Sequence, residues 1–397
     1  MIPELSEEVH DVDLPVRPEE VLRVVRQQRA DYVDFVRRIA EMESPSTEPA
    51  AQHDWQRFIA EALRRLGYAP THLPGDETGG CLYARPSDRC EDAPYQLLLG
   101  HGDTVWDRGT LDRMPVHVSD GRLHGPGVFD MKAGLASIVF ALRTLDRLGV
   151  EIPVTPAILM TSDEEIGSGE SRRHIERLAA GANRTYVLEP ALGLEGKIKT
   201  TRKGTGDLEL IVRADDEAPG NAVVLELSRL VQHLYTLNDP DRGVTVNVGM
   251  IDGRPRGTTA EGRLAVDARV PTIEDARRID AAIRDIEAST PGLTVEVRGG
   301  MDRDPMEATP ANRRLWQRAY RLGATIGLEL EEGRSGGASD GNLTSPLTAT
   351  LDGLGAVGDG AHAEHEHIDI DATLERCALL ALLMLDEPVP PLPPAVG

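Results

Sequence analysis

Positive charge is scarce in this sequence. It contains 43 lysine and arginine residues against 66 aspartate and glutamate residues, which gives a formal net charge of −23. Only four of the basic residues are lysines, and the arginines are scattered rather than clustered. Because such an acidic chain repels phosphate groups, we exclude nucleic acids and anionic membrane surfaces as expected partners.

Cysteines, aromatic residues and long apolar runs are also rare. Three cysteines cannot build a disulfide framework in 397 residues, and none forms a CxxC pair. The opening MIPELSEEVHDVDLP lacks the basic and apolar regions of a signal peptide, and no run approaches the roughly 18 apolar residues of a membrane span. These absences predict a cytoplasmic protein. With 4% aromatic residues, the chain offers few stacking platforms for a large flat ligand.

The length of 397 residues exceeds one compact core and predicts two or three domains. Two helical patterns occupy residues 18–67, and apolar strands then alternate with helices up to about residue 203. Strands are expected at 96–99, 154–160 and 185–188, and a helix at 133–148. This alternation favours an α/β fold for residues 1–203, with a mostly parallel sheet covered on both faces.

Residues 204–303 have a different pattern. Segments of period two and two helical segments, the second at 273–288, follow the order βαββαβ of a ferredoxin-like sandwich. We therefore expect a ferredoxin-like domain inserted into the α/β domain, whose second part is residues 304–397 and closes with a helix at 372–385. The proline-rich tail from about residue 387 should be extended and mobile.

Histidine and acidic residues follow several strands of the α/β region. His101 and Asp103 follow the strand in LLLGHGDTV, acids follow the strand in ILMTSDEE, and another follows the strand in YVLEP. A further aspartate stands where the helix in GPGVFDMKAG begins. Because the carboxyl ends of parallel strands meet at one edge of a sheet, we expect these side chains to gather there. The candidates are His101, Asp130, Glu164, Glu165 and Glu189.

Each candidate taken singly has an ordinary interpretation. Asp130 could cap its helix, the DEE run could be a solvated turn, and a lone histidine is more often a hydrogen-bonded polar residue than a ligand. The conjunction of HxD with acids after two further strands favours a metal site. Imidazoles with carboxylates suit zinc, manganese or cobalt, and Asp103 is placed to accept the second N–H of the His101 ring.

A second histidine could come from the glycine-rich segment GLGAVGDGAHAEHEHIDI. Spacing alone leaves His362, His365 and His367 as alternatives, and the segment could instead be a surface stretch that scavenges metal.

Two other motifs are weaker. GRSGG fits the GxSxG pattern of serine hydrolases through Ser335, with an aspartate and His362 following in hydrolase order. A nucleophile elbow needs a helix directly after the serine, however, and GGASDGNLTSP does not predict one. GPGVFD fails the dinucleotide fingerprint because Asp130 stands at the third glycine position.

Six motifs in order resemble the co-catalytic zinc exopeptidase family of bacterial glutamate carboxypeptidase, aminoacylase, acetylornithine deacetylase and succinyl-diaminopimelate desuccinylase. They are GHGDTVW, GPGVFDMKAG, TSDEEIGS, VLEP, RSGGASD and GAHAEHEHIDI, and they are most similar to the glutamate carboxypeptidase branch. The resemblance covers about residues 30–385. It implies two divalent ions, zinc or alternatively manganese or cobalt, bridged by Asp130 before a cis peptide bond. The implied ligands are His101 and Glu189 at one ion and Glu165 and His362 at the other.

The resemblance also implies a reaction. A hydroxide bridging the metals would attack an amide carbonyl, with Glu164 as general base and Asp103 as the orienting partner of His101. Arg334 would hold a free carboxylate of the substrate, with Arg269 as an alternative anchor. The expected substrate is a small molecule or peptide in which the amide adjoins a free carboxylate. Either a C-terminal peptide bond or an N-acyl amino acid is expected, and a glutamate-type substrate is favoured.

One departure from the family pattern concerns the inserted domain. Relatives carry a His-Ala-Gly loop whose histidine reaches the active site of a partner subunit, but this chain reads RADDEAPGNAV there, and GTTAEG replaces a usual asparagine. His233 is the nearest substitute in sequence. Removal of an oxyanion donor costs about a hundredfold or more. A catalytically weakened or inactive relative that binds metal and an acylated amino acid or a partner is therefore an alternative. A homodimer through the inserted domain is the expected assembly, with a different subunit arrangement as its alternative.

Overall fold

The computed structural model describes residues 14–89, 93–215, 218, 221–254 and 261–388. The chain divides into two compact units. The first comprises Met1–Thr200, Ala308–Gly333 and Thr344–Gly397, and the second comprises Thr201–Glu307 and Arg334–Leu343. Most of the N-terminal arm and of the proline-rich tail lies outside the described residues. Among the described residues, no helix has the length and apolarity required to cross a membrane.

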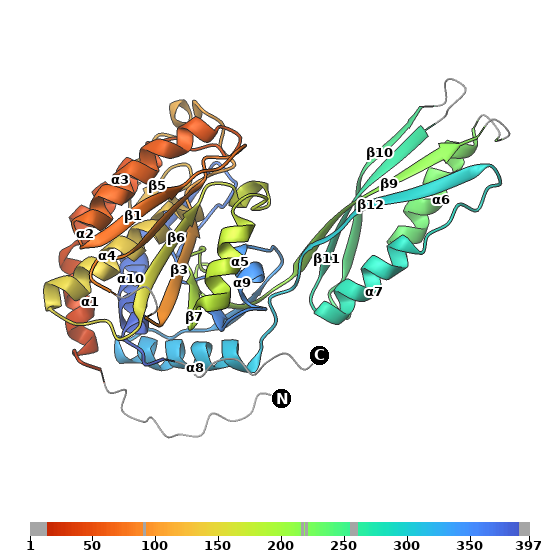
Figure 1. Cartoon of the computed structure of the whole chain (residues 1–397). Helices are drawn as coiled ribbons and strands as arrows, with labels where there is room; N and C mark the ends of the chain where they lie inside the picture. Colours follow the sequence, from red (N-terminus) through yellow and green to blue (C-terminus); the bar gives the residue numbers. More distant parts are fainter. Residues whose placement is uncertain (1–13, 90–92, 216–217, 219–220, 255–260, 389–397) are drawn as a thin grey trace. The chain divides into compact units, whose positions relative to one another are not determined.

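A six-stranded sheet forms the centre of the first unit (Figure 1). Its order is β1-β2-β6-β3-β7-β14; β6, β3, β7 and β14 run parallel, and β2 is antiparallel to both of its neighbours. β3 and β6 are buried along nearly their whole length, so both faces of the sheet are covered. The predicted α/β fold with a mostly parallel sheet is confirmed. The strands are β1 (Tyr68–Leu73), β2 (Cys81–Pro86), β3 (Tyr95–His101), β6 (Thr155–Thr161), β7 (Arg184–Val187) and β14 (Thr350–Leu351).

Helices of the first unit pack around this sheet. α4 contacts α10, α1 and α2, and nearly all of its residues are buried. α4 has the bounds predicted from its stripe of apolar residues, and it ends at Gly149, whose φ of 63° is a left-handed conformation that glycine adopts readily. The helices are α1 (Pro18–Gln27), α2 (Arg29–Ala40), α3 (Gln52–Arg64), α4 (Ala133–Leu148), α5 (Arg172–Gly181), α8 (Pro310–Thr325) and α10 (Ile370–Met384). The short helix α9 (Asp340–Thr344) lies mostly within the segment 334–343 of the second unit.

The prediction of two helical segments over residues 18–67 is wrong, because the structure has three helices there, α1, α2 and α3. The break between the first two falls at Gln28, whose side chain is buried and donates a hydrogen bond to Thr144 Oγ1 at 2.7 Å. This contact is with a residue of α4, far away in sequence, so the local periodicity of residues 18–40 does not report it.

Smaller sheets carry loops that are important for the site. A four-stranded antiparallel sheet has the order β15-β16-β5-β4, and β8 (Ile198–Arg202) pairs with β13 (Glu332–Ser335). The loop after β5 leads to Asp130, and the loop between β15 and β16 contains His362 and Glu366. The four strands are β4 (His117–Ser119), β5 (Arg122–His124), β15 (Gly358–Asp359) and β16 (His367–Asp369).

The second unit is an antiparallel sheet with two helices on one face. Its order is β10-β11-β9-β12, which is the arrangement of a ferredoxin-like βαββαβ unit, and both helices pack on the sheet. Leu210, Leu264 and Ile279 lie in the core between the layers. The predicted ferredoxin-like fold is confirmed. The elements are β9 (Gly204–Ala214), α6 (Ala222–Tyr235), β10 (Thr245–Arg254), β11 (Glu261–Val270), α7 (Ile273–Arg284) and β12 (Leu293–Arg303).

α7 ends at Arg284, earlier than the predicted helix at 273–288, and a buried carboxylate binds residues 289 and 290 beyond it. Glu226 of α6 is 1% exposed and accepts hydrogen bonds from the Ser289 amide at 3.0 Å, from the Ser289 hydroxyl at 2.9 Å and from the Thr290 hydroxyl at 3.0 Å. Arg229 Nε also donates to it at 2.8 Å. Burial acts to raise the pKa of Glu226, but these donors outweigh it and lower that pKa to about 2.

We expect Glu226→Gln to destabilise the fold at pH 7 by about 1–3 kcal/mol, because buried donors lose a charged acceptor. The folded pKa of about 2 lies below the ordinary value of 4.5, so this stabilisation is complete above about pH 4.5 and is lost as the pH falls toward 2. Urea unfolding at pH 7 and pH 3 measures the effect, and the difference from the wild type should shrink at pH 3.

Glu274→Gln is the control, because Glu274 lies on α7 with 83% of its side chain exposed. Its effect should stay below about 0.5 kcal/mol at both pH values. A Glu226→Gln effect that is equally large at pH 3 would contradict the linkage.

Candidate metal centre

Three parallel strands bring acidic and histidine side chains to one edge of the central sheet. His101 is the last residue of β3, and Glu164 and Glu165 lie in a short 3₁₀ turn after β6. Glu189 follows β7, the other neighbour of β3. Asp130 approaches from the loop after β5, and the peptide bond between it and Met131 is cis, as the family resemblance implied.

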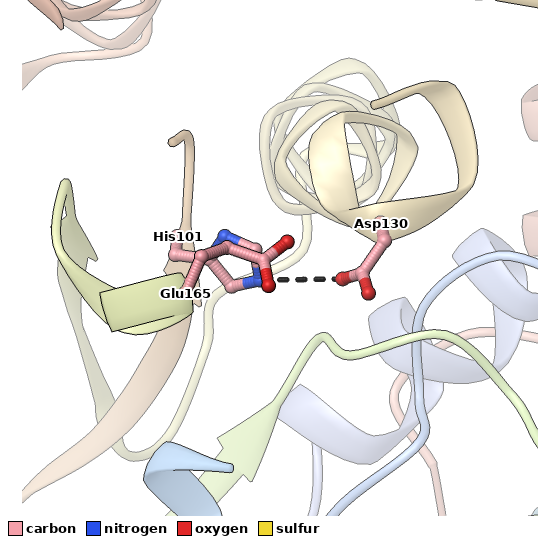
Figure 2. A group of neighbouring side chains, drawn as sticks. All are labelled: His101, Asp130 and Glu165. Atoms are coloured by element: carbon pink, nitrogen blue, oxygen red, sulfur yellow. Dashed lines mark ion pairs between the residues drawn. The ribbon is translucent and has the colours of Figure 1, made fainter. Parts of the chain in front are cut away.

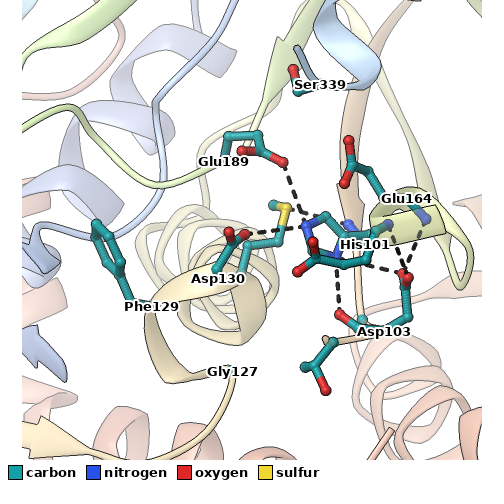
Figure 3. Close-up of polar contacts among 12 residues, drawn as sticks. His101, Asp103, Gly127, Phe129, Asp130, Glu164, Glu189 and Ser339 are labelled. Carbon is teal, nitrogen blue, oxygen red and sulfur yellow. Dashed lines mark hydrogen bonds and ion pairs between the residues drawn. The ribbon is translucent and has the colours of Figure 1, made fainter. Parts of the chain in front are cut away.

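Asp130 lies between two imidazole rings and presents one oxygen to each. His101 Nε2 is 3.2 Å from Asp130 Oδ1 and 3.4 Å from Glu189 Oε1. On the other side, His362 Nε2 is 3.4 Å from Asp130 Oδ2 and 3.1 Å from Glu165 Oε2. Figure 2 shows His101, Asp130 and Glu165 directed toward one another, and Figure 3 shows the contacts of His101 with Asp130 and Glu189. The result is two sets of candidate ligands that share one carboxylate.

The spacing of these atoms fits divalent ions. Ligands about 2.0–2.1 Å from a tetrahedral zinc ion are about 3.3 Å from one another, close to the four separations around Asp130. Ligand atoms of His101, Asp130 and Glu165, and also of His101, Glu164 and Glu189, all lie within 4.8 Å of one another. Nitrogen among the ligands disfavours calcium and magnesium, which prefer oxygen.

Two buried polar atoms at this point have no hydrogen-bond partner among the residues that the structure describes. They are His101 Nε2 and Asp130 Oδ1, which face one another across the first ligand set. An unpaired buried polar atom costs about 1–3 kcal/mol, and a cation bound by both atoms would remove that cost. The residues present therefore fit a metal ion.

The charges of the site also fit a bound metal ion. Burial acts to lower the pKa of His101, but Asp103, Asp130 and Glu189 outweigh it and raise that pKa well above its usual value. Contacts with Asp130 and Glu165 raise the pKa of His362 to about 10. The carboxylates thus attract positive charge to both rings, as protons or as metal ions, so metal binding should release protons.

Of the three histidines that spacing left open, His362 is the one beside Asp130 and Glu165. His365 Nε2 lies 3.8 Å from Asp359, and the His367 ring packs 5.3 Å from the His124 ring. The backbone of His362 has a φ of 61°, a left-handed conformation that is unfavourable for a residue with a side chain. Such strain is common at functional sites.

Asp103 contributes through backbone contacts as well as through His101. The ring Nδ1 of His101 is 3.0 Å from the main-chain oxygen of Asp103 and 3.5 Å from its carboxylate. The carboxylate accepts hydrogen bonds from the backbone amides of Glu164 and Glu165 at 3.3 and 3.2 Å, and from the Ser46 hydroxyl at 2.7 Å. Asp103 therefore connects the end of β3 to the turn that carries both glutamates.

Other residues near the ligands have no sequence signal that would identify them. Lys199 Nζ lies 3.9 Å from Glu189 Oε2, and Ser46 reaches Asp103 from the segment after α2. Glu366 accepts hydrogen bonds from the loop that carries Asp130, and the Trp106 indole also donates to it. Ser46 and Glu366 were missed because their partners are distant in sequence, and Lys199, ten residues after Glu189, stands in no motif.

The remaining candidates lie in the second unit. Arg334 is exposed on β13, and Arg269 Nη1 donates to the carbonyl of Gly336 at 3.4 Å, so the two proposed anchors belong to adjacent segments. His233 is an exposed residue of α6. Residues 216, 217, 219 and 220 of RADDEAPGNAV, and residues 257–260 of GTTAEG, lie outside the described residues.

The serine hydrolase alternative is not supported by local structure. β13 ends at Ser335, and the next helix, α9, begins only at Asp340. The Ser335 hydroxyl donates to the carbonyl of Gly337 at 3.0 Å, which is a local turn contact. A nucleophile elbow requires a strand, a sharp turn and an immediate helix.

Comparison with known proteins places this geometry in context. The model for peptidase family M20/M25/M40 matches residues 97–386. Carboxypeptidase G2 of a Pseudomonas species is 27% identical over 354 residues, which cover 83% of this chain and 82% of the relative. Succinyl-diaminopimelate desuccinylase of Stenotrophomonas maltophilia is 28% identical over 342 residues, which cover 80% and 89%.

Solved structures share the fold at lower identity. An aminopeptidase of Bacillus cereus has a TM-score of 0.70 at 18% identity, with 90% of this chain and 98% of that chain covered. A dinuclear metal-binding peptidase of Bacillus subtilis has a TM-score of 0.65 at 15% identity, with 91% and 98% covered.

We expect the shared carboxylate to determine how many ions are retained. Asp130→Asn should lose both ions, because Asp130 contacts both imidazoles, whereas Glu165→Gln and Glu189→Gln should each lose about one. Elemental analysis after dialysis against metal-free buffer gives the ions per chain. Glu195→Gln, at an exposed position six residues after Glu189, should retain the wild-type number. Full retention in Asp130→Asn would exclude its bridging role.

Proposed function

The chain belongs to peptidase family M20/M25/M40 and is therefore a metallohydrolase of the peptidase and amidohydrolase type; on that premise we propose that it cleaves an amide bond adjacent to a free carboxylate. The resemblance inferred from the ordered motifs is confirmed by this membership. The observation that carries the proposal is the pair of ligand sets that share Asp130, with Glu164 beside them. The names of the two curated relatives, a carboxypeptidase and a succinyl-diaminopimelate desuccinylase, support a carboxylate-bearing substrate.

The proposed cofactor is a pair of divalent ions, zinc first and manganese or cobalt as alternatives. His101, Glu189 and Asp130 would hold one ion, and His362, Glu165 and Asp130 the other. When bound, such ions polarise a carbonyl and acidify water. The dinuclear site named for the Bacillus subtilis structure supports two ions rather than one.

The proposed role of Glu164 follows from its position. Its carboxylate lies within 4.8 Å of ligand atoms of His101 and Glu189, and its backbone amide donates to Asp103 Oδ1 at 3.3 Å. A carboxylate held in this way can accept a proton from the attacking water and transfer it to the leaving nitrogen. Asp103 would keep Glu164 in place by binding its backbone.

A second candidate function follows from the loop of the inserted domain. RADDEAPGNAV has no histidine, so one donor to the developing oxyanion would have to come from elsewhere. A metal-binding relative with weakened or absent catalysis is therefore the alternative, and it predicts two bound ions without turnover. Three further expectations remain predictions: residues 204–303 form an inserted lid or dimerisation-type domain, the chain forms a homodimer, and the protein is cytoplasmic.

We expect Glu164→Ala to retain both ions and to lower kcat by about 10²–10⁴-fold, because a general base contributes about that much. The assay is hydrolysis of N-acyl amino acids, dipeptides and glutamate conjugates, with metal content measured on the same samples. Treatment of the wild type with a chelator should abolish activity, and zinc should restore it. Unchanged turnover in Glu164→Ala would remove this residue from the mechanism.

Arg334→Lys should raise KM about tenfold for substrates with a free carboxylate and change kcat little. A guanidinium binds a carboxylate through two parallel hydrogen bonds, which an ammonium cannot reproduce. Substrates whose carboxylate is amidated are the control, because wild type and variant should hydrolyse them equally. An unchanged KM would transfer the proposed role to Arg269, to be tested by Arg269→Lys.

A further inference from the structure

A buried carboxylate outside both sets of candidate ligands lies close to them. The side chain of Glu366 is 1% exposed and accepts four hydrogen bonds. Oε1 accepts from the backbone amides of Phe129 at 2.9 Å and Asp130 at 3.1 Å. Oε2 accepts from the backbone amide of Gly127 and from Trp106 Nε1, both at 2.8 Å. In the described part of the chain, no ion pair of Glu366 is found, and its hydrogen-bond partners are N–H groups.

These hydrogen bonds connect three segments that carry metal-site residues. Trp106 follows the segment of His101 and Asp103, residues 127–130 end at Asp130, and Glu366 itself lies four residues after His362. The backbone is involved as well, because the Gly125 amide donates to the carbonyl of Glu366 at 3.2 Å. Figure 3 shows the loop with Gly127 and Phe129 leading to Asp130 beside His101. Glu366 is therefore the common acceptor of elements far apart in sequence.

The arrangement requires a carboxylate and not merely a polar side chain. Both of its oxygens accept, and each receives two N–H donors. A glutamine of the same shape has one oxygen and one NH₂ group, so two of the four donors would face another donor. Loss of two acceptor positions in a buried site leaves unpaired N–H groups, which the loop can relieve only by moving.

We propose that Glu366 is a positioning residue of the metal centre, which holds the Asp130 loop against the His362 loop and so sets the separation of the two ions. This inference rests on the proposed function, since it requires two ions that share Asp130. Glu366 contacts neither ion nor substrate; it acts on the orientation of the shared carboxylate. Because each ligand set uses a different oxygen of Asp130, a small rotation of this loop would alter both sets together.

The test uses the full-length protein loaded with Mn²⁺, in which two ions joined by one carboxylate give an exchange-coupled EPR spectrum. For Glu366→Gln we expect the second Mn²⁺ to bind at least tenfold more weakly and the coupled signal to be lost. In the same samples kcat should fall at least tenfold, with KM changed by less than about threefold. Glu366→Asp keeps the charge on a shorter side chain, so it should recover part of the coupled signal.

Two further variants serve as comparisons for Glu366→Gln. Glu364→Gln makes the same chemical change at a side chain that is 74% exposed and two residues away, and it should match the wild type in metal affinity, spectrum and kinetics. Trp106→Phe removes one of the four donors and keeps an aromatic side chain, so it should weaken the binding of the second ion less than Glu366→Gln does.

The possible results distinguish the positioning role of Glu366 from the proposed function. If the wild type binds two coupled ions and folded Glu366→Gln binds them with the same affinity and spectrum, the positioning role is wrong and the proposed function is untouched. If Glu366→Gln does not fold, Trp106→Phe decides, and wild-type affinity and spectrum in that variant overturn the positioning role. If the wild type binds fewer than two ions, the dinuclear function itself fails.

Discussion

The site depends on a single carboxylate shared between two imidazole rings. Asp130 Oδ1 faces His101 and Asp130 Oδ2 faces His362, at 3.2 and 3.4 Å. Without cations this arrangement places several carboxylates in a buried space, where their mutual repulsion must be offset by raised histidine pKa values. The two ligand sets are therefore one electrostatic unit, since a change at Asp130 affects both histidines.

A second layer of carboxylates holds this unit in place through backbone amides. Asp103 accepts from the amides of Glu164 and Glu165, and Glu366 accepts from the amides of Phe129 and Asp130. Both are almost fully buried. A buried carboxylate that binds backbone N–H groups fixes the path of the chain more firmly than a side-chain contact would, because the backbone cannot change rotamer. The candidate ligands thus lie on loops, and those loops are held by buried carboxylates next to strands.

The two units differ in where their charged side chains lie. In the first, buried acids such as Asp103 and Glu366 accept hydrogen bonds from backbone amides. The second unit also buries Glu226, but its sheet face away from the helices carries cross-strand ion pairs such as Arg213–Glu261 and Arg263–Glu209. Exposed pairs of this kind contribute little stability each, about 0–1 kcal/mol. The second unit is therefore stabilised mainly by its apolar core of Leu210, Leu264 and Ile279, together with the buried Glu226.

The sequence by itself determined the fold class and the chemical type of the site. The buried β3 and β6 and the stripe of α4 are visible as local apolar patterns, and HxD, DEE and VLEP stand after strands whose ends must meet in a parallel sheet. Tertiary structure alone decided the break at Gln28 and the early end of α7 after Arg284. Spacing left three histidines open, the family resemblance implied His362, and the structure places His362 beside Asp130 and Glu165. It also revealed Glu366, whose four donors come from residues between 236 and 260 positions away. Periodicity and spacing indicate which face of its own helix or strand a residue occupies. They do not indicate which backbone N–H groups, distant in sequence, require a hydrogen-bond acceptor, and contacts of that kind determine the positions of these residues.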